Sequence, residues 1–446
     1  MPDLSLPWPS THHKATSVWW QDEAGLSAEC PPLSGDREAD VAIVGGGYCG
    51  LWTALALKER DPSLDVVVLE RAFCGEGPSG RNGGFLHGYW SSLPSLVQTF
   101  GDAGALALAR ASQGAVDAVR ALGEDVWLRE AGLLKVSAAT AQDAAVERSL
   151  AEAERLGVPE EAVAAEAFHF RRAVRFRDGA TVQPARLALA LRRAARAAGV
   201  AVHERTPVAR RGSVLATPGG RVRTAAVVLA TGAPPLPRRL TQFSSYVVLT
   251  EPVPELLTEL GWTEGEAIVD GRMFLHYFRT TQDGRVLMGS GSGPIGRYRH
   301  DPASVARAER GLRRLLPSLA GARITHAWGG PIDVSADRFP FVGTLRDGTR
   351  YAAGFSGNGV GPTWLAGQVL ASLVSGREDE WTALPLLDRR LRRPPPPEPL
   401  TRLGGAAVRA AVLRVEEAEE DGRRPPAVAR AIAAVPRILR IQLGVR

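Results

Sequence analysis

The feature that most restricts the fold of this chain is a glycine motif between a strand-like run and a helix-like run. Residues 39–44 are apolar and β-rich, G-G-G-Y-C-G follows at 45–50, and residues 51–60 have helical character up to Asp61-Pro62. In such a unit the first glycine allows the tight turn and the second lets the backbone approach a pyrophosphate. The third lets helix and strand pack closely, which directs the helix N-terminus at the phosphates. The motif predicts a Rossmann-like unit that binds an adenine dinucleotide.

The second strand of this unit supports the same interpretation. Residues 65–70 read as a strand that ends in Glu70, twenty residues beyond Gly50. A carboxylate at this position accepts both ribose hydroxyls and disfavours a 2′-phosphate. A second G-x-G-x-x-G at 291–296 contains Pro294, opens no helix, and is followed twenty residues later by Leu316 rather than an acid. We interpret it as a turn, so a separate NAD-binding domain is unsupported.

Two further glycine-rich segments are suited to holding a cofactor. Residues 75–84 combine five glycines with a serine, Arg81 and an asparagine, and exposed N–H groups with one cation suit a phosphate or an electron-rich ring. Residues 354–361 join a strand at 350–353 to a helix at 363–375, whose N-terminus would stabilise a reduced flavin. A strand at 226–230 ends at Thr231-Gly232, where backbone could again meet the dinucleotide.

These segments together resemble the FAD-dependent D-amino-acid oxidase superfamily, which includes glycine oxidase and monomeric sarcosine oxidase. The S-G-R-N-G-G run at 79–84, the G-F-S-G-N-G-V run at 354–360 and W-G-G-P at 328–331 are most similar to the γ-glutamylputrescine oxidase-like branch. The resemblance covers roughly residues 36 to 375. It implies oxidation of a C–N bond by hydride transfer to flavin N5, hydrolysis of the imine, and reoxidation by dioxygen to give peroxide.

The expected fold class is α/β, with a discontinuous Rossmann-like FAD-binding domain, a mixed-sheet substrate domain and a helical C-terminal tail. An N-terminal arm is expected at 1–36 and the tail at 379–446. Between them the two domains alternate along the chain. The FAD-binding domain is expected to take residues 37–100, 169–240 and 326–378, and the substrate domain residues 101–168 and 241–325.

The sequence departs from the family pattern in ways that bear on the substrate. Glycine oxidase-like members hold a substrate carboxylate with two arginines, and the aligned positions here are Gly330 and Gly357. An amine without a tightly held α-carboxylate therefore fits better than an α-amino acid. Sarcosine oxidase-like members attach flavin through a late cysteine, but no cysteine follows Cys74. Non-covalent FAD is expected, with His87 as the remaining candidate for covalent attachment.

Candidate catalytic residues are His87, His276, Tyr277 and, as an anion anchor, Arg279. Residues 273–279 alternate as a strand, so His276 lies on one face and Tyr277 and Arg279 on the other, and only one face can line the pocket. An equally valid interpretation of His276 is a structural histidine that makes its hydrogen bonds within the sheet. The predicted cofactor-binding residues are Gly45, Gly47, Tyr48, Cys49, Gly50, Glu70, Arg71, Gly77, Ser79, Gly80, Arg81, Asn82, Gly83, Gly84, Val208, Ala230, Thr231, Gly232, Gly330, Phe355, Ser356, Gly357, Asn358, Gly359, Val360 and Gly361.

The distribution of charge argues against a nucleic-acid partner. The net charge of the 446 residues is +6, and residues 388–446 carry all of it, with 13 arginines against 7 acidic residues. The rest of the chain is neutral, so nucleic acid is not an expected partner. The family resemblance implies a small amine and dioxygen instead. The basic amphipathic tail could bind an acidic surface, but packing against the body or a second subunit is the commoner outcome. A monomer or homodimer is expected.

Cysteine usage and apolar runs indicate the compartment. Three cysteines form neither a disulfide framework nor a zinc site, which suggests a reducing environment. No secretory signal is visible, and the longest apolar run, 41–57, contains four glycines and is short for a membrane span. We expect a cytoplasmic protein without a metal.

Several functions remain open at this stage beside an FAD-dependent amine oxidase. Oxygen activation in related oxidases uses a lysine near the flavin, and no lysine follows Lys135, so a dehydrogenase with another acceptor is a rival. An amino-acid oxidase, a tRNA-modifying flavoenzyme and a flavin-binding scaffold without turnover are the others. The neutral body argues against the tRNA reading.

Overall fold

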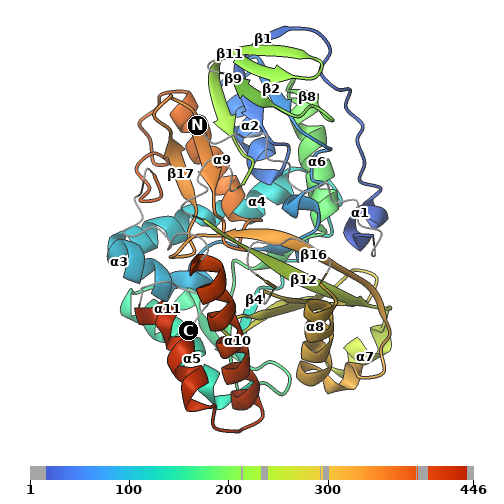
Figure 1. The fold of residues 1–446 in the computed structure, drawn as a ribbon, viewed down its shortest axis with the longest axis vertical. Coiled ribbons are helices and arrows are strands. Elements are labelled where there is room, and N and C mark those ends of the chain that lie inside the picture. The colour runs from blue at the N-terminus through green and yellow to red at the C-terminus, as the bar shows by residue number, and fades with distance from the viewer. Residues whose placement is uncertain are drawn as a thin grey trace.

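The computed structural model describes residues 17–211, 214–232, 240–291, 293–294, 301–387, 389 and 400–438. Within these ranges the strands form two eight-stranded sheets and one two-stranded sheet. Some residues of the second glycine motif (292 and 295–296) and the proline run 394–397 lie outside the described residues. Figure 1 shows the first sheet and its helices in the upper half of the view, with the second sheet below them.

The first sheet contains the predicted dinucleotide-binding unit. Its strand order is β17-β18-β11-β1-β2-β8, with β10 and β9 attached beside β11. The core strands β18, β11, β1, β2 and β8 run parallel, and buried aliphatic runs in β1 and β2 are typical of a sheet covered on both faces. The strands are β1 (Arg37–Val44), β2 (Val66–Leu69), β8 (Ala201–His203), β9 (Ala209–Arg211), β10 (Val214–Thr217), β11 (Gly220–Leu229), β17 (Phe341–Thr344) and β18 (Arg350–Ala353).

Three helices from distant regions of the chain pack together beside this sheet. Helix α2 (Tyr48–Arg60) contacts both α6 (Pro184–Ala197) and α9 (Pro362–Val374). The carboxyl end of β1 leads through Gly45–Gly47 into α2, and β18 leads through residues 354–361 into α9. Since parallel strands end at one edge, both glycine turns lie at the edge where α/β sheets bind ligands.

The second sheet is mixed and follows the order β16-β12-β15-β14-β13-β4-β6-β5. Its longest pairing joins β12 and β16 antiparallel, and α8 (Pro302–Leu315) packs against β12 and β15. The strands are β4 (Leu133–Ser137), β5 (Val163–Ala165), β6 (Arg172–Phe176), β12 (Thr241–Thr250), β13 (Ala267–Asp270), β14 (His276–Thr280), β15 (Val286–Ser290) and β16 (Ile324–Val334). Strands β6 and β16 thus belong to this sheet, although the boundaries expected from sequence grouped them with the FAD-binding domain.

The remaining elements cover the sheets and connect them. Strands β3 (Phe85–Leu86) and β7 (Ala180–Thr181) form the small sheet. The other helices are α1 (Trp19–Ala24), α3 (Leu93–Ser112), α4 (Gly114–Ala121), α5 (Thr140–Arg155), α7 (Pro254–Glu259), α10 (Leu400–Glu420) and α11 (Ala427–Ile438). No helix within the described ranges is long and apolar enough to cross a bilayer.

The N-terminal arm is fixed to the first sheet through a buried carboxylate. Glu204, which is fully buried after β8, accepts hydrogen bonds from the backbone N–H groups of Glu29, Cys30 and Cys74. The Arg192 guanidinium of α6 lies 3.1 Å from the same carboxylate and also bonds the Ser27 carbonyl. Residues 27–30 therefore belong to the folded body, which composition alone did not indicate.

One strand predicted from sequence begins later than expected. The alternating pattern predicted a strand from Met273, but β14 begins at His276 and residues 273–274 form a turn. The Glu416 carboxylate of α10 accepts hydrogen bonds from the N–H groups of Met273 and Phe274 at 2.5 and 3.3 Å. This contact takes the two N–H groups out of the sheet, so the strand predicted from residue 273 is wrong for residues 273–275.

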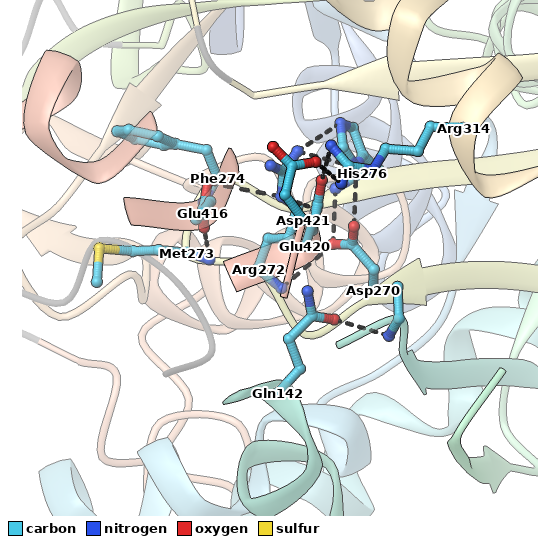
Figure 2. A network of polar contacts seen from close by, with 11 residues as sticks. Gln142, Asp270, Arg272, Met273, Phe274, His276, Arg314, Glu416, Glu420 and Asp421 are labelled. Atoms are coloured by element: carbon cyan, nitrogen blue, oxygen red, sulfur yellow. Dashed lines mark hydrogen bonds and ion pairs between the residues drawn. The ribbon is translucent and has the colours of Figure 1, made fainter. Parts of the chain in front are cut away.

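The C-terminal tail packs against the body, which is one of the arrangements expected from the sequence. Figure 2 shows Glu416 and Glu420 of α10 beside Arg272, and Asp421 beside Arg314. Phe274 packs with Val412 of α10 and Ala433 of α11 in a separate apolar cluster. Helix α11 continues past Pro436, which lies within its last residues.

Candidate active site

The first turn of the site is shaped by close backbone contacts that only glycine permits. Gly45 has φ +112°, and a Cβ built there would lie 2.6 Å from the Ala230 carbonyl oxygen at the end of β11. A Cβ at Gly50 would lie 2.0 Å from the Gly45 carbonyl oxygen. The turn therefore brings β1, β11 and the first turn of α2 together, as the glycine spacing predicted.

Glu70 lies at the end of β2 beside this turn. Its carboxylate accepts hydrogen bonds from the Gly46 N–H at 2.7 Å and the Ala72 N–H at 2.8 Å. Burial raises the pKa of Glu70, and these two N–H groups oppose that shift. Each bond uses one lone pair of a different oxygen, so both oxygens retain capacity to accept a ribose hydroxyl.

The loop at residues 75–84 is organised by its own side chains. Ser79 Oγ accepts the Tyr48 N–H at 3.0 Å, which joins the loop to the start of α2. Asn82 donates to the Ser79 carbonyl and accepts the Gly84 N–H. The buried Arg81 guanidinium donates to the Glu76 carbonyl at 2.7 and 3.0 Å and pairs with the Glu76 carboxylate. These contacts hold the loop against the start of α2 and against itself.

The third glycine segment, residues 354–361, meets the other two. Ser356 has φ +55° and donates its backbone N–H to the Asp333 carbonyl, which holds this uncommon conformation in place. A Cβ at Gly361 would lie 2.3 Å from the His87 carbonyl oxygen, so α9 begins directly beside the end of β3. Asn358 Oδ1 is buried without a hydrogen-bond partner. An unsatisfied acceptor of this kind indicates a group that the described residues do not supply.

These segments form one cradle that fits a flavin dinucleotide. Thr231 and Gly232 follow β11 beside Gly45, and Gly232 approaches Asp333 of β16. Phe355 is half-buried, while Val360 is buried and packs against α9 and its neighbours. Val208 lies after β8 and packs on the first sheet, and Arg71 is exposed next to Glu70. The predicted cofactor-binding residues thus come from segments that converge, and their contacts with FAD remain a prediction.

Tyr277 is the candidate residue that faces this cradle from the second sheet. A Cβ at Gly83 would lie 2.8 Å from the Tyr277 ring, and one at Gly289 would overlap it. The Tyr277 hydroxyl lies 2.7 Å from Ser245 Oγ, and the Phe85 ring packs edge-on at 5.6 Å. Burial raises the pKa of Tyr277 to about 12, so the hydroxyl keeps its proton at neutral pH.

Arg279 lies on the same face but is held by backbone carbonyls. Its guanidinium donates to the carbonyls of Val182 at 2.6 Å, Gly84 at 3.1 Å and Thr280 at 3.0 Å. Burial, assisted by the charge of Arg129, lowers the pKa of Arg279 to about 9. The structure therefore places Arg279 as a brace for the end of the 75–84 loop, and its expected role as an anion anchor is not favoured.

His276 lies on the opposite face of the second sheet from Tyr277. Its Nδ1 is 2.8 Å from Asp270 Oδ2, and its Nε2 is 3.0 Å from an Arg272 guanidinium nitrogen (Figure 2). A Cβ at Gly311 of α8 would lie 2.8 Å from the same ring. Both ring nitrogens have hydrogen-bond partners, so we interpret His276 as a structural residue and leave it out of the proposed catalytic set.

His87 lies next to the cradle, at the turn after β3. Its Nδ1 is 2.9 Å from the Gly88 carbonyl, which fixes the proton on that nitrogen. Burial lowers the pKa of His87, so the ring is neutral at pH 7. Its main chain is packed against Gly361, which places it between the second and third glycine segments.

Two residues that the sequence did not single out support the site. Ser245 is the hydrogen-bond partner of Tyr277, and Asp178 accepts the Gly88 N–H at 3.0 Å. Burial raises the pKa of Asp178 to about 6. A lone serine in a strand carries no local signal, and Asp178-Gly179 reads only as a turn, so neither position could be identified without the fold.

Comparison with known proteins agrees with this geometry. The family profile described as DAO, FAD dependent oxidoreductase, matches residues 40–373. The chain is 30% identical over 393 residues to gamma-glutamylputrescine oxidoreductase of Escherichia coli K12, which covers 82% of this chain and 91% of the relative. It is 28% identical to a probable oxidoreductase of Rhizobium meliloti, over 89% of this chain and 94% of that protein.

Solved structures share the fold at lower sequence identity. Glycine oxidase from Geobacillus kaustophilus superposes with a TM-score of 0.65 at 23% identity, covering 80% of this chain and all of that one. L-proline dehydrogenase from P. horikoshii superposes with a TM-score of 0.63 at 19% identity, covering 79% of this chain and 96% of that one. The predicted α/β fold is thereby confirmed.

Proposed function

The chain belongs to the DAO family of FAD-dependent oxidoreductases, and we propose that it oxidises the C–N bond of a primary or secondary amine that carries no tightly bound α-carboxylate. The amine would lose a hydride from its α-carbon and a proton from nitrogen. Water would convert the imine to a carbonyl compound plus ammonia or an amine. Dioxygen would take up the two electrons and two protons as hydrogen peroxide.

One observation carries the choice of substrate class. Three arginines among the described residues, Arg81, Arg279 and Arg338, approach the candidate site, and each donates a guanidinium N–H group to a backbone carbonyl. A Cβ at Gly330 would meet only the aliphatic stem of Arg81, at 3.6 Å, and a Cβ at Gly357 would meet no atom within 4 Å. Neither Gly330 nor Gly357 supplies the guanidinium that the family pattern has at these positions, which supports an amine without a tightly bound α-carboxylate as the substrate.

FAD, when bound, supplies the two-electron oxidant for this reaction. The protein's contribution is positioning and exclusion of water, because hydride transfer requires the reacting carbon at short range. The glycine segments would hold the cofactor, with Glu70 accepting from the ribose. The Tyr277–Ser245 pair would orient the substrate from the second sheet, and the neutral His87 lies next to the cradle.

The substrate class is tested by anaerobic bleaching of the FAD-loaded protein. A panel of primary and secondary amines, together with α-amino acids of matched side chain, is mixed with the yellow protein, and the absorbance of oxidised flavin is followed. We expect amines to bleach the flavin faster than the matched amino acids. Faster bleaching by the amino acids would overturn the proposed substrate class in favour of an amino-acid oxidase.

Readmission of air distinguishes an oxidase, which reduces dioxygen, from a dehydrogenase, which passes its electrons to another acceptor. An oxidase regains its colour with one equivalent of peroxide, whereas a dehydrogenase regains it only with an artificial acceptor. Bleaching without rapid reoxidation by air would favour the dehydrogenase.

We expect Tyr277→Phe to lower kcat/KM for the best amine about five- to tenfold, the effect of one lost hydrogen bond to the reacting complex. FAD content and the visible spectrum should not change, because the ring and its contacts remain. Tyr246→Phe is the matched control. Tyr246 pairs across β12 and β15 with Ser290, which pairs with His276, so it lies on the face away from Tyr277. Equal losses in both variants would exclude the proposed role of Tyr277.

A further inference from the structure

The outer face of the C-terminal helical hairpin is unlike the rest of the surface. Among the described residues, every large hydrophobic side chain classed as exposed lies on α10 or α11. These side chains are Leu400 (61% exposed), Leu403 (67%), Val428 (72%), Val435 (38%) and Ile438 (76%). A gathering of exposed aliphatic side chains on one structural unit of a protein marks an interaction surface.

The inner face of the same hairpin is fixed by ion pairs, of which the Glu420–Arg272 pair is buried. Glu420 pairs with Arg272 at 2.8 Å and Arg314 at 3.2 Å, and Asp421 pairs with Arg314 at 2.5 Å. Glu416 accepts the Met273 N–H, as Figure 2 shows. On α11, Ala429, Ala433 and Pro436 face inward and are buried. Glu416, Glu420 and Asp421 are thus directed at the body, and the orientation of α11 is set.

The outward face of α11 combines aliphatic and basic side chains. Val428, Val435 and Ile438 are spaced by seven and three residues, which puts them on one stripe of the helix. Arg430 and Arg437 are exposed beside this stripe. Residues 422–446 contain six arginines and no aspartate, glutamate or lysine, and the sequence after Ile438 continues with aliphatic residues alternating with Arg440 and Arg446.

We propose that the outer face of α11 binds the surface of an anionic phospholipid bilayer, with the helix lying in the interface. The aliphatic stripe would enter the boundary between headgroups and acyl chains, and the arginines would pair with lipid phosphates. A second copy of the chain fits less well, because a two-fold contact through α11 would bring arginines against arginines. Nucleic acid also fits less well, since residues 422–446 contain no aromatic side chain to stack on bases.

Co-sedimentation of the full-length, FAD-loaded protein with vesicles tests this proposal. One set of vesicles is phosphatidylcholine mixed with phosphatidylglycerol, and the other is phosphatidylcholine alone. We expect partitioning into the anionic vesicles at least about tenfold above the neutral ones. Salt at about 1 M should weaken binding by screening the arginines. The triple variant V428S/V435S/I438S and the double variant R430Q/R437Q should each lower partitioning about tenfold.

The double variant R221Q/R223Q is the matched control. It removes the same charge from two exposed arginines of β11 on the first sheet, and its partitioning should equal that of the unmodified protein. Flavin absorbance and thermal unfolding verify that each variant is folded. We expect all of them to fold, because the altered side chains are exposed.

Three outcomes would overturn the proposal: no sedimentation with anionic vesicles, equal sedimentation with both kinds, or loss of partitioning in R221Q/R223Q as large as in R430Q/R437Q. A protein that is dimeric without lipid, and that V428S/V435S/I438S makes monomeric without changing its partitioning, would assign the face to a second copy instead.

Discussion

Gly50→Val is expected to yield a protein that binds little or no FAD. A Cβ at this position would lie 2.0 Å from the Gly45 carbonyl oxygen and 3.2 Å from an Ile43 methyl group. Backbone cannot yield to such a contact, so α2 must move away from β1 and the Gly45–Gly47 turn must open. Overpacking of this kind costs about 3 kcal/mol. If that cost falls on binding, affinity for FAD falls roughly a hundredfold. Flavin absorbance per protein and titration of the apoprotein with FAD measure the effect.

Two further variants separate lost binding from lost folding. Glu70→Gln keeps the shape of the side chain but removes its charge, so we expect FAD affinity to fall about tenfold with a folded apoprotein. Gly404→Ala in α10 is the glycine control, because a Cβ there meets no atom within 4 Å. It should bind FAD normally. A Gly50→Val protein with full flavin content would contradict the assignment of the turn at Gly45–Gly50 to FAD binding.

Glu204→Ala is expected to lower the free energy of unfolding by about 3–5 kcal/mol, the cost of removing one partner of a buried ion pair. The Glu204 carboxylate is fully buried and receives the Cys30 and Cys74 N–H groups, and its loss would leave the Arg192 guanidinium, which is 1% exposed, with the partly exposed Glu29 carboxylate as its remaining ionic partner. Denaturant unfolding of the FAD-loaded protein gives the difference. Glu130→Ala, which removes a carboxylate from an exposed pair with Arg120, is the control and should change little.

The same carboxylate predicts a pH dependence. Burial opposes its ionisation, but the N–H groups of Cys30 and Cys74 and the Arg192 guanidinium outweigh this and hold the pKa of Glu204 below its ordinary value. The contribution of Glu204 to the free energy of unfolding is therefore fully present above the pKa of about 4.3 that the group has in the unfolded chain. It is lost as pH falls through the pKa that Glu204 has in the folded protein. The stability difference between the unmodified protein and Glu204→Ala should shrink on acidification below about pH 4. A difference that stays constant would show that folding does not change the pKa of Glu204, and a difference that grows would show that folding raises it.

Features encoded locally could be predicted from the sequence. The turn at Gly45–Gly50 and the acid at Glu70 follow from spacing within one strand–helix–strand unit, and the structure places both at the edge of the first sheet. The 75–84 and 354–361 segments were recognisable because glycine-rich turns next to strands have few other uses. Their convergence follows from the parallel order of β11, β1 and β18.

Features that depend on distant partners could not be predicted. Alternation in residues 273–279 gives two faces, but which one lines the pocket is decided by Gly83 and Gly289 approaching Tyr277. The start of β14 depends on Glu416, which is 143 residues away in sequence. The guanidiniums of Arg81 and Arg279 looked available for a ligand, yet backbone carbonyls use them. The residue pattern within one segment holds no information about its contacts with segments that are distant in the sequence.

The interleaving of the two sheets has a consequence for biosynthesis. Strand β18 and the segment after it enter the first sheet only after residue 361 has left the ribosome, whereas β1 and β2 emerge much earlier. Until then the end of β11 that pairs with β18 is unpaired on that side, and an exposed strand edge can pair wrongly. The cradle cannot close before residues 354–361 are synthesised, so the yellow prosthetic group is expected to be acquired only then and to hold the early strands and the late segment together.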